Sequence, residues 1–252
     1  MKHFTILLLC IYNLFAYSKG LNGSYIQLKD SSYFLITFAG WSVKQDWANN
    51  WTKSIVQAKS NFKNYSFIAF KGPDDVLFKS KYDIDVYDNV LDFIEKAKKI
   101  KKVIIIAHSS GTFVAHNFLK HLYKVDTTKL FYKKISYYNL DGDIGSVEDD
   151  TFLSDDIANY LNKLNCVFAV DTLTNSFSAN YKQMINIKNT YPFCNLIKLL
   201  ANANICNKGA KWCLHDYLIV KMPFNKNTFD LKKDYYENNN YLSVNVDYLT
   251  EE

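Results

Sequence analysis

The residues best suited to chemistry lie in the ten-residue run Lys102–Gly111, KVIIIAHSSG. Its β-branched stretch, Val103 to Ile106, predicts a strand that is buried on both faces. Small residues and a serine follow, and an apolar pattern typical of a helix comes next. A serine on a sharp turn between a strand and a helix is the setting of a nucleophile elbow, which exposes the hydroxyl at the end of the strand. The run therefore predicts Ser109 as a nucleophile.

A serine hydroxyl needs an adjacent base before it can attack, and the usual base is a histidine. The chain has five histidines. His3 lies in an N-terminal segment that we expect to be removed, and His108 lies inside the turn, where its side chain should point away from the cleft. His116 and His121 lie on the following helix, where a solvated ring tip is the ordinary arrangement. Elimination leaves His215 as the predicted base.

A third group must hold the second ring nitrogen of that histidine, and a carboxylate is the usual choice. Asp171 ends the second predicted strand after the serine, and Asp141 ends the first. We expect Asp171 to be the acid and keep Asp141 as the alternative. Either aspartate could instead cap a turn, which is a common role for this residue type.

Acyl transfer also requires backbone N–H groups that stabilise a developing oxyanion. One donor is expected from Ser110, the residue after the nucleophile, and the other from a loop after an early strand. The stretch that contains Gly40 and Trp41 fits this second role, because a glycine lets the backbone approach closely. The alternative interpretation of Gly40 is an ordinary glycine turn.

These residues must be positioned by strands that alternate with helices along most of the chain. Such alternation implies right-handed crossovers and a parallel sheet covered on both faces. We therefore predict an α/β fold with a mainly parallel central sheet and helices on both faces. Sites in such sheets lie beyond the carboxyl ends of strands, where Ser109 and both aspartates fall.

Apolar periodicity gives the expected elements. Residues 178–187 are ambiguous between helix and strand, residues 212–222 are predicted to be partly strand, and no final strand can be placed between Asp171 and His215. The predicted strands are Ser24–Leu28, Tyr33–Phe38, Tyr65–Phe70, Val103–Ala107, Lys134–Leu140 and Cys166–Val170, and the predicted helices are Ser42–Phe62, Ile84–Lys101, Ser110–Tyr123, Asp155–Leu164 and Tyr191–Ala203.

Length and charge narrow the classes of function. A chain of 252 residues can bury one large core, and we assign residues 21–252 to a single domain. The formal net charge of +5 is too small to indicate nucleic acid or a charged membrane surface as a partner. All 30 basic residues are lysines, which argues against bidentate clamps for phosphate or carboxylate groups. The cysteines form no C-x-x-C pair, so no metal site is expected.

Residues 1–20 have the pattern of a secretory signal peptide. A short polar start is followed by an apolar stretch from Phe4 to Tyr17, and small residues at Ala16 and Ser18 suit cleavage after Ser18. Cleavage after Gly20 is the alternative. The expected location is outside the cell or in the lumen of the secretory pathway.

The cysteines agree with an oxidising location, since four of the five lie beyond the signal segment. Three pairings of these four are possible, and we favour Cys206–Cys213 with Cys166–Cys194. Three N-x-[ST] sequons predict glycosylation at Asn22, Asn50 and Asn64.

The elbow Ala-His-Ser-Ser-Gly, the eligible His215 and the order serine, acid, histidine together resemble the α/β-hydrolase superfamily, especially secreted lipases and esterases. The resemblance covers most of residues 24–222, and alanine in place of the first elbow glycine is a variant found among bacterial lipases. It implies a Ser-Asp-His triad that works without a metal or a cofactor. It also implies a small-molecule or lipid ester as substrate, with transient contact to a lipid surface and no nucleic acid.

The resemblance leaves other activities open, because one fold hosts many chemistries. A thioesterase, a peptidase or an acyltransferase would use the same groups. A binding protein that has lost activity on the same fold is the alternative from another class. The acyl-chain length, a lid over the site and the oligomeric state are not encoded in any pattern of the sequence.

Overall fold

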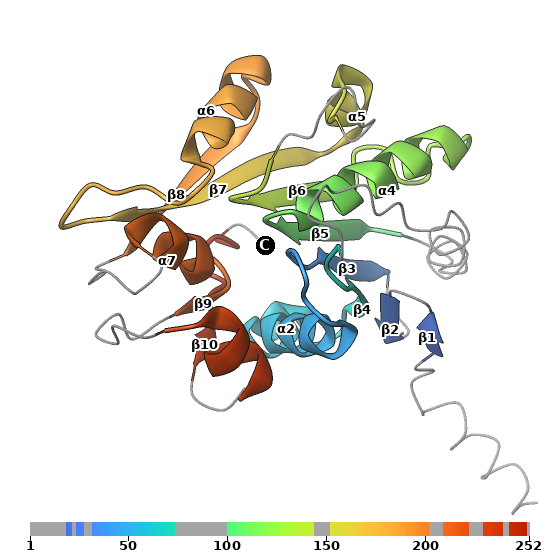
Figure 1. The fold of residues 1–252 in the computed structure, drawn as a ribbon. Coiled ribbons are helices and arrows are strands. Elements are labelled where there is room, and N and C mark those ends of the chain that lie inside the picture. Colours follow the sequence, from blue (N-terminus) through green and yellow to red (C-terminus); the bar gives the residue numbers. More distant parts are fainter. Residues whose placement is uncertain are drawn as a thin grey trace, which may run out of the picture.

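The computed structural model describes residues 19–21, 24–27, 32–73, 100–143, 152–201, 209–221, 229–238 and 242–250. A twisted sheet in the order β1-β2-β4-β3-β5-β6-β7-β8 forms the centre of the molecule (Figure 1). Its strands are β1 (Lys19–Leu21), β2 (Ser24–Gln27), β3 (Tyr33–Phe38), β4 (Ser66–Phe70), β5 (Lys102–His108), β6 (Ile135–Leu140), β7 (Lys163–Asp171) and β8 (Asn195–Ala201).

The six neighbouring strands β4, β3, β5, β6, β7 and β8 run parallel to one another. At the edge of the sheet, β2 pairs antiparallel with β4, and β1 pairs antiparallel with β2. The chain passes from β3 outward to β4 and then returns to the other side of β3 to form β5. Connections therefore leave the carboxyl ends of β3 and β5 toward opposite sides. Such a switch point is where open α/β sheets hold their ligands.

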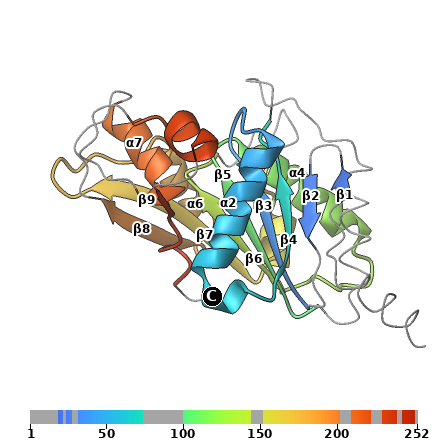
Figure 2. The ribbon, with the colours of Figure 1, turned by 90° about the horizontal axis from the view of Figure 1, so that it is seen from below.

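Helices cover both faces of the sheet, as predicted. Figure 1 shows α4 (Gly111–Val125), α5 (Asp155–Tyr160) and α6 (Tyr181–Thr190) on one face. Seen from below, α2 (Gln45–Ala58) crosses the other face, and α7 (Ala210–Tyr217) lies on the same face (Figure 2). A short 3-10 turn, η1 (Ser60–Phe62), a π-helical segment, η2 (Leu231–Glu237), and a ribbon of β9 (Val220–Lys221) and β10 (Ser243–Val244) complete the described elements.

Alternation along the strands divides the core into two layers, because successive side chains of a strand point to opposite faces. In β3, Phe34 and Ile36 join the layer beneath α4, α5 and α6, while Leu35 joins the layer beneath α2 and α7. Burial on both faces explains why β5 is a continuous β-branched run rather than an alternating one.

One predicted element is wrong. Tyr191–Ala203 was expected to be a helix, but Asn195–Ala201 is strand β8, paired in register with β7 from Asn165 to Asp171. A short apolar run does not distinguish a strand from a buried helix by periodicity alone. The ambiguous residues 178–187 contribute most of α6, and residues 212–222 are mainly the helix α7 with only the two-residue strand β9.

The N-terminal predictions fall partly outside the described residues. Lys19 and Gly20 pair with β2, so cleavage after Ser18 would keep the edge strand β1, whereas cleavage after Gly20 would remove most of it. The predicted helix Ile84–Lys101 lies almost wholly in residues 74–99, and the sequon at Asn22 is also outside the described part. No helix among the described residues is both long enough and apolar enough to span a bilayer.

Candidate active site

The turn after β5 holds Ser109 in a conformation that non-glycine residues seldom adopt. Strand β5 ends at His108 and α4 begins at Gly111, so two residues connect a strand to a helix. Ser109 has φ 54°, and its N–H donates to the carbonyl of Leu140 at 3.0 Å. Strain of this kind persists where surrounding structure imposes it, often at functional sites. The predicted elbow geometry is therefore present.

Gly111 is required by the close packing of α4 on the end of β3. A Cβ atom there would lie 2.5 Å from the carbonyl oxygens of both Phe38 and Ala39. These are backbone atoms of a buried strand end, so they cannot move aside easily. The second glycine of the elbow thus reflects a steric need, and it lets the helix begin directly behind the serine.

A buried contact between a histidine and a carboxylate lies at the same edge of the sheet. The Nδ1 atom of His215, on α7, is 2.5 Å from Oδ2 of Asp141, which follows β6. Asp141 is fully buried and its other carboxylate oxygen, Oδ1, accepts from the hydroxyl of Ser178 at 2.8 Å and from the N–H of Asn180 at 3.1 Å. The carboxylate is thereby fixed in one orientation, and it directs Nδ1 of the imidazole toward itself, which leaves Nε2 free for another partner.

The structure does not pair the favoured acid, Asp171, with His215; the alternative, Asp141, is the carboxylate that contacts this histidine. Asp171 holds its own turn instead, accepting from the N–H of Leu173 at 2.9 Å and the hydroxyl of Thr174 at 3.0 Å. The order of the strands explains the difference. Asp141 follows β6, which adjoins β5, whereas Asp171 ends β7, one strand further away. Each strand adds about 4.8 Å of separation.

The side chain of Thr112 links the turn after β5 to the turn after β6 by hydrogen bonds. Thr112 Oγ1 donates to the carbonyl of Ser109 at 2.8 Å and accepts from the N–H of Asp143 at 3.2 Å. A Cβ atom on Gly142 would lie 2.1 Å from Cγ2 of Thr112 and 2.7 Å from the carbonyl oxygen of Ser109. The nucleophile turn and the acid turn therefore fit against each other with no room for a side chain between them.

The loop after β3 lies beside the elbow, as predicted. A Cβ atom on Gly40 would lie 3.2 Å from Cβ of Ser109, and a Cβ atom on Gly72 would overlap the carbonyl oxygen of Gly40 at 1.6 Å. Two glycines thus let this loop approach the serine and let β4 support it. Within the part of the chain that the structure describes, the N–H groups of Trp41 and Ser110 donate to no protein acceptor. Donors left open beside a nucleophile are what an oxyanion hole requires.

His108 touches the site, although the sequence placed its side chain away from the cleft. Its ring centroid is 4.4 Å from that of His215, and its Nε2 is 3.3 Å from the carbonyl oxygen of His215. A Cβ atom on Gly40 would lie 3.1 Å from its Nδ1. Burial, and next the neighbouring His215, lower the pKa of His108 well below its usual value. A neutral imidazole therefore fills the space between the Gly40 loop and His215.

These features agree with a match to a family model. Residues 77–160 match the family described as "Alpha/beta hydrolase of unknown function (DUF900)", and this stretch contains both Ser109 and Asp141. The match covers a third of the chain and agrees with the α/β-hydrolase fold that the described sheet shows. No curated protein matches it.

Solved structures resemble this chain at low identity. The Pyrococcus furiosus esterase Pf2001 has 15% identity and a TM-score of 0.45, with 71% of this chain and 77% of that chain covered. A predicted CIB-like hydrolase from Thermoplasma acidophilum has 12% identity and a TM-score of 0.44, covering 74% and 86%. A capsule O-acetyltransferase of Neisseria meningitidis serogroup A has 13% identity and a TM-score of 0.42, covering 75% and 87%.

His116, on α4, lies away from the candidate site. His116 is buried rather than solvated at its tip, and its Nε2 lies 3.0 Å from the hydroxyl of Tyr137. The expectation of an exposed ring was therefore wrong. Its exclusion as the base stands, because His116 joins the layer beneath α4 whereas the pair of Asp141 and His215 lies at the carboxyl edge.

The cysteines agree only in part with the favoured pairing. Cys166 and Cys194 are buried free thiols whose sulfur atoms lie 2.8 Å apart, so the predicted partners meet without being bonded. Burial, and then the contact with Cys194, raise the pKa of the Cys166 thiol well above its usual value. Cys213 is disulfide-bonded, while its predicted partner, Cys206, lies outside the described residues.

The predicted glycosylation sites that can be placed differ in their surroundings. Asn64 is exposed in the turn before β4, which suits a bulky glycan. Asn50 lies in the middle of α2 and is half-buried. Of these two, Asn64 is the site that the fold leaves accessible.

Proposed function

We propose that the protein is a serine hydrolase that cleaves carboxylic esters through Ser109, His215 and Asp141. The observation that carries the proposal is the buried contact of 2.5 Å between His215 Nδ1 and Asp141 Oδ2, at the sheet edge where Ser109 has φ 54°. A carboxylate that holds one imidazole nitrogen leaves the other to act on a serine hydroxyl. This arrangement supports nucleophilic catalysis over a binding role alone.

In the proposed mechanism, Ser109 Oγ attacks the carbonyl carbon of the ester while Nε2 of His215 accepts the hydroxyl proton. Asp141 stabilises the resulting imidazolium and keeps it oriented. The carbonyl oxygen becomes an oxyanion, which accepts hydrogen bonds from the N–H of Ser110 and from the loop at Gly40 and Trp41. Collapse of this intermediate breaks the ester bond, and His215 gives its proton to the departing alcohol.

Water completes the reaction in a second, similar pair of steps. His215 takes a proton from a water molecule as its oxygen attacks the acyl carbon on Ser109. Collapse releases the carboxylic acid, and the proton returns to Ser109 Oγ. If another alcohol or an amine took the place of water, the same groups would perform acyl transfer, so the acceptor distinguishes an esterase from an acyltransferase.

The N-terminal pattern supports an extracytoplasmic location for the enzyme. Lipid or other acyl esters are proposed as substrates because of the aromatic side chains near the site. Exposed aromatic side chains border the proposed site. Trp212, on α7, is 54% exposed and its ring lies 5.5 Å from that of His215, while Trp41, in the oxyanion loop, is 47% exposed. Aromatic side chains at the mouth of a site suit an apolar or ring-containing substrate.

The proposal is tested with p-nitrophenyl esters from acetate to palmitate and with a fluorophosphonate probe that labels activated serines. The wild-type protein should hydrolyse at least one ester and be labelled once, whereas Ser109→Ala should lose both properties. Ser60→Ala serves as the control, because Ser60 is exposed in η1 and outside the site. Labelling of Ser109→Ala, or hydrolysis at the wild-type rate, would refute the mechanism.

A further inference from the structure

A cavity of about 590 Å³ opens beside the proposed triad, between the loop that leads into α6 and the start of α7. Its wall comes from two segments that follow neighbouring strands, β7 and β8. The lining residues are the run Asn175–Gln183 and, from α7, Lys211.

The cavity is continuous with the machinery that holds the acid. Ser178 and Asn180 belong to its wall, and both donate hydrogen bonds to the carboxylate of Asp141. The side-chain amide of Asn180 also donates to the carbonyl of Asp141 at 2.6 Å. Lys211 precedes His215 by four residues on α7, and residues with that spacing lie on the same side of a helix. A group bound in the cavity would therefore adjoin the ester-cleaving site.

The charges in this wall have one sign. Among the described residues that line the cavity, the charged ones are Lys182 and Lys211, and none of them carries a carboxylate. Within the described residues, neither lysine forms an ion pair. Each lies in the first turn of its helix, α6 or α7, where the backbone adds positive potential. The carboxylate of Asp141 lies behind the wall and accepts hydrogen bonds from Ser178 and Asn180. The charges that the wall itself presents to the cavity are the two ammonium groups, which favour an anion.

The neutral part of the lining is polar enough to bind a hydrated group rather than a long acyl chain. Asn175, Ser176 and Gln183 offer amide and hydroxyl groups. The aromatic contribution comes from Phe177 and Tyr181, whose rings stack on each other with centroids 4.0 Å apart. Their mutual stacking leaves hydrogen-bonding groups and two ammonium groups as the distinctive chemistry of this wall.

We propose that this cavity binds an anionic group carried by the substrate, so that the enzyme prefers esters with a free carboxylate or phosphate over neutral esters of the same size. Lys182 and Lys211 supply the charge, and the amides of Asn175 and Gln183 supply hydrogen bonds. Lysine ammonium groups act as point charges, so the selectivity is for charge and not for a planar bidentate shape. This inference rests on the proposed ester hydrolysis at Ser109.

The test compares two acetate esters of nearly equal size that differ in charge, 3-acetoxybenzoate and the neutral 3-acetoxybenzamide. The ratio of kcat/KM for the anionic over the neutral ester should exceed unity by about five- to tenfold in the wild type, since each exposed ion pair contributes modestly. The double variant Lys182→Gln/Lys211→Gln should bring the ratio near one, mainly through KM of the anionic ester. Raising the salt concentration should lower the wild-type ratio, because exposed charges are screened.

The matched control is Lys198→Gln, which removes an exposed lysine of the neighbouring strand β8 that does not line the cavity. This variant should keep the wild-type ratio and the wild-type rate on the neutral ester. Equal ratios in the wild type and the double variant would overturn the inference while leaving ester hydrolysis at Ser109 intact.

A binding measurement separates failure of this inference from failure of the proposed function. Isothermal titration of 3-hydroxybenzoate into Ser109→Ala should show binding that the added Lys182→Gln/Lys211→Gln changes abolish. If the wild type cleaves neither ester and the probe does not label Ser109, the proposed function fails, and the anion preference of the cavity is still decided by this titration. Absence of binding to Ser109→Ala would refute the anion site by itself.

Discussion

Two buried aspartates at opposite edges of the sheet have nearly the same local environment and very different chemistry. Asp141 follows β6 at the carboxyl edge, and Asp126 follows α4 at the amino edge. Both are buried, and each accepts a side-chain hydrogen bond of 2.5 Å, from His215 and from Tyr160 respectively. A buried carboxylate with a short hydrogen bond therefore does not identify an active site by itself.

At the amino edge the partner cannot move a proton in the ordinary pH range. Burial, and then the hydrogen bond to Asp126, raise the pKa of the Tyr160 phenol far above its usual value. Backbone N–H groups of Leu130 and Phe131 complete the coordination of Asp126 at 2.6 and 3.0 Å. The carboxylate organises the loop after α4, which is a structural role.

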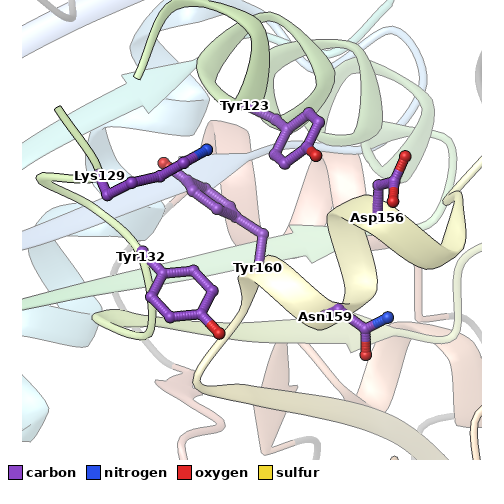
Figure 3. A pocket seen from close by; sticks show the side chains of 6 residues that line it. All are labelled: Tyr123, Lys129, Tyr132, Asp156, Asn159 and Tyr160. Carbon is purple, nitrogen blue, oxygen red and sulfur yellow. The ribbon is translucent and has the colours of Figure 1, made fainter. Parts of the chain in front are cut away.

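A cavity of about 330 Å³ lies beside this structural aspartate, and Figure 3 shows the side chains around it. The ammonium of Lys129 lies 5.1 Å from the ring centroid of Tyr123 and 6.0 Å from that of Tyr160, so a cation of the chain itself already contacts these ring faces. The wall also carries the carboxylate of Asp156, which offsets the charge of Lys129. The described lining of this cavity carries charges of both signs, unlike that of the cavity beside Asp141.

At the carboxyl edge the partner of the aspartate is an imidazole, which can accept and return a proton. Two of the strained turns in the structure meet there, since Ser109 has φ 54° and Asp141 has φ 46°. The open N–H groups of Trp41 and Ser110 lie in the adjoining turns. The comparison indicates that a site is recognised by the convergence of a nucleophile, a titrating partner and unpaired donors.

The comparison is tested most severely by neutralising each aspartate at the carboxyl edge. Asp141→Asn should lower kcat about 10³- to 10⁴-fold on a p-nitrophenyl ester, because an amide cannot hold the imidazole in the required tautomer or stabilise its cation. Asp171→Asn should retain activity within a few-fold, since Asp171 only caps its own turn. Steady-state kinetics with circular dichroism of the folded variants measure both effects, and a larger loss in Asp171→Asn would reverse the assignment.

That pair of variants also marks what the sequence could and could not predict. The elbow was predictable because a buried strand, a serine turn and a helix are encoded within ten consecutive residues. The acid was not, because Asp141 and Asp171 both end predicted strands and only the order of β5, β6 and β7 in the sheet separates them.

Tertiary placement accounts for the other errors. His108 contacts His215 only because α7 returns to the carboxyl edge, 107 residues further along the chain, so no local pattern reports this contact. The strand β8 was taken for a helix because pairing with β7, and not local periodicity, decides its conformation. The cavity beside Asp141 is equally invisible in the sequence, since Lys182 and Lys211 meet only in the folded chain.

A smaller loss of activity is expected when a side chain is added between the turn at Ser109 and the turn at Gly142. Gly142→Ala would place a methyl group 2.1 Å from Cγ2 of Thr112, and the resulting shift of the elbow should lower kcat about 10²-fold. The double variant Gly142→Ala/Thr112→Ser removes that methyl partner and keeps the hydroxyl that donates to Ser109. Partial recovery of kcat in the double variant is expected, because the contacts of 2.7 Å with the Ser109 carbonyl oxygen and with Thr112 Oγ1 remain. No recovery would show that the contact with Cγ2 does not cause the loss.

A substitution next to Asp126, at the amino edge of the sheet, should lower the free energy of unfolding and leave kcat unchanged. Tyr160→Phe removes the hydroxyl that donates to Asp126, and the loss of a buried hydrogen bond to a carboxylate should lower the free energy of unfolding by about 1–3 kcal/mol. Urea denaturation measures this change, and kcat should stay at the wild-type value. A clear loss of kcat at unchanged stability would contradict the structural role of this edge.

The smallest effect concerns His108, which is neutral in the folded protein because burial lowers its pKa. The unfolded chain takes up a proton on this residue near its ordinary pKa of about 6.5, whereas the folded protein does not. Below that pH the unfolded state therefore binds more protons, and stability should fall as the pH falls. His108→Phe keeps a ring against His215 but cannot be protonated. Its unfolding free energy should depend less on pH between 6.5 and 5, by up to about 1.4 kcal/mol per pH unit. Identical slopes for the two proteins in urea denaturation across this range would mean that His108 is charged in the folded state.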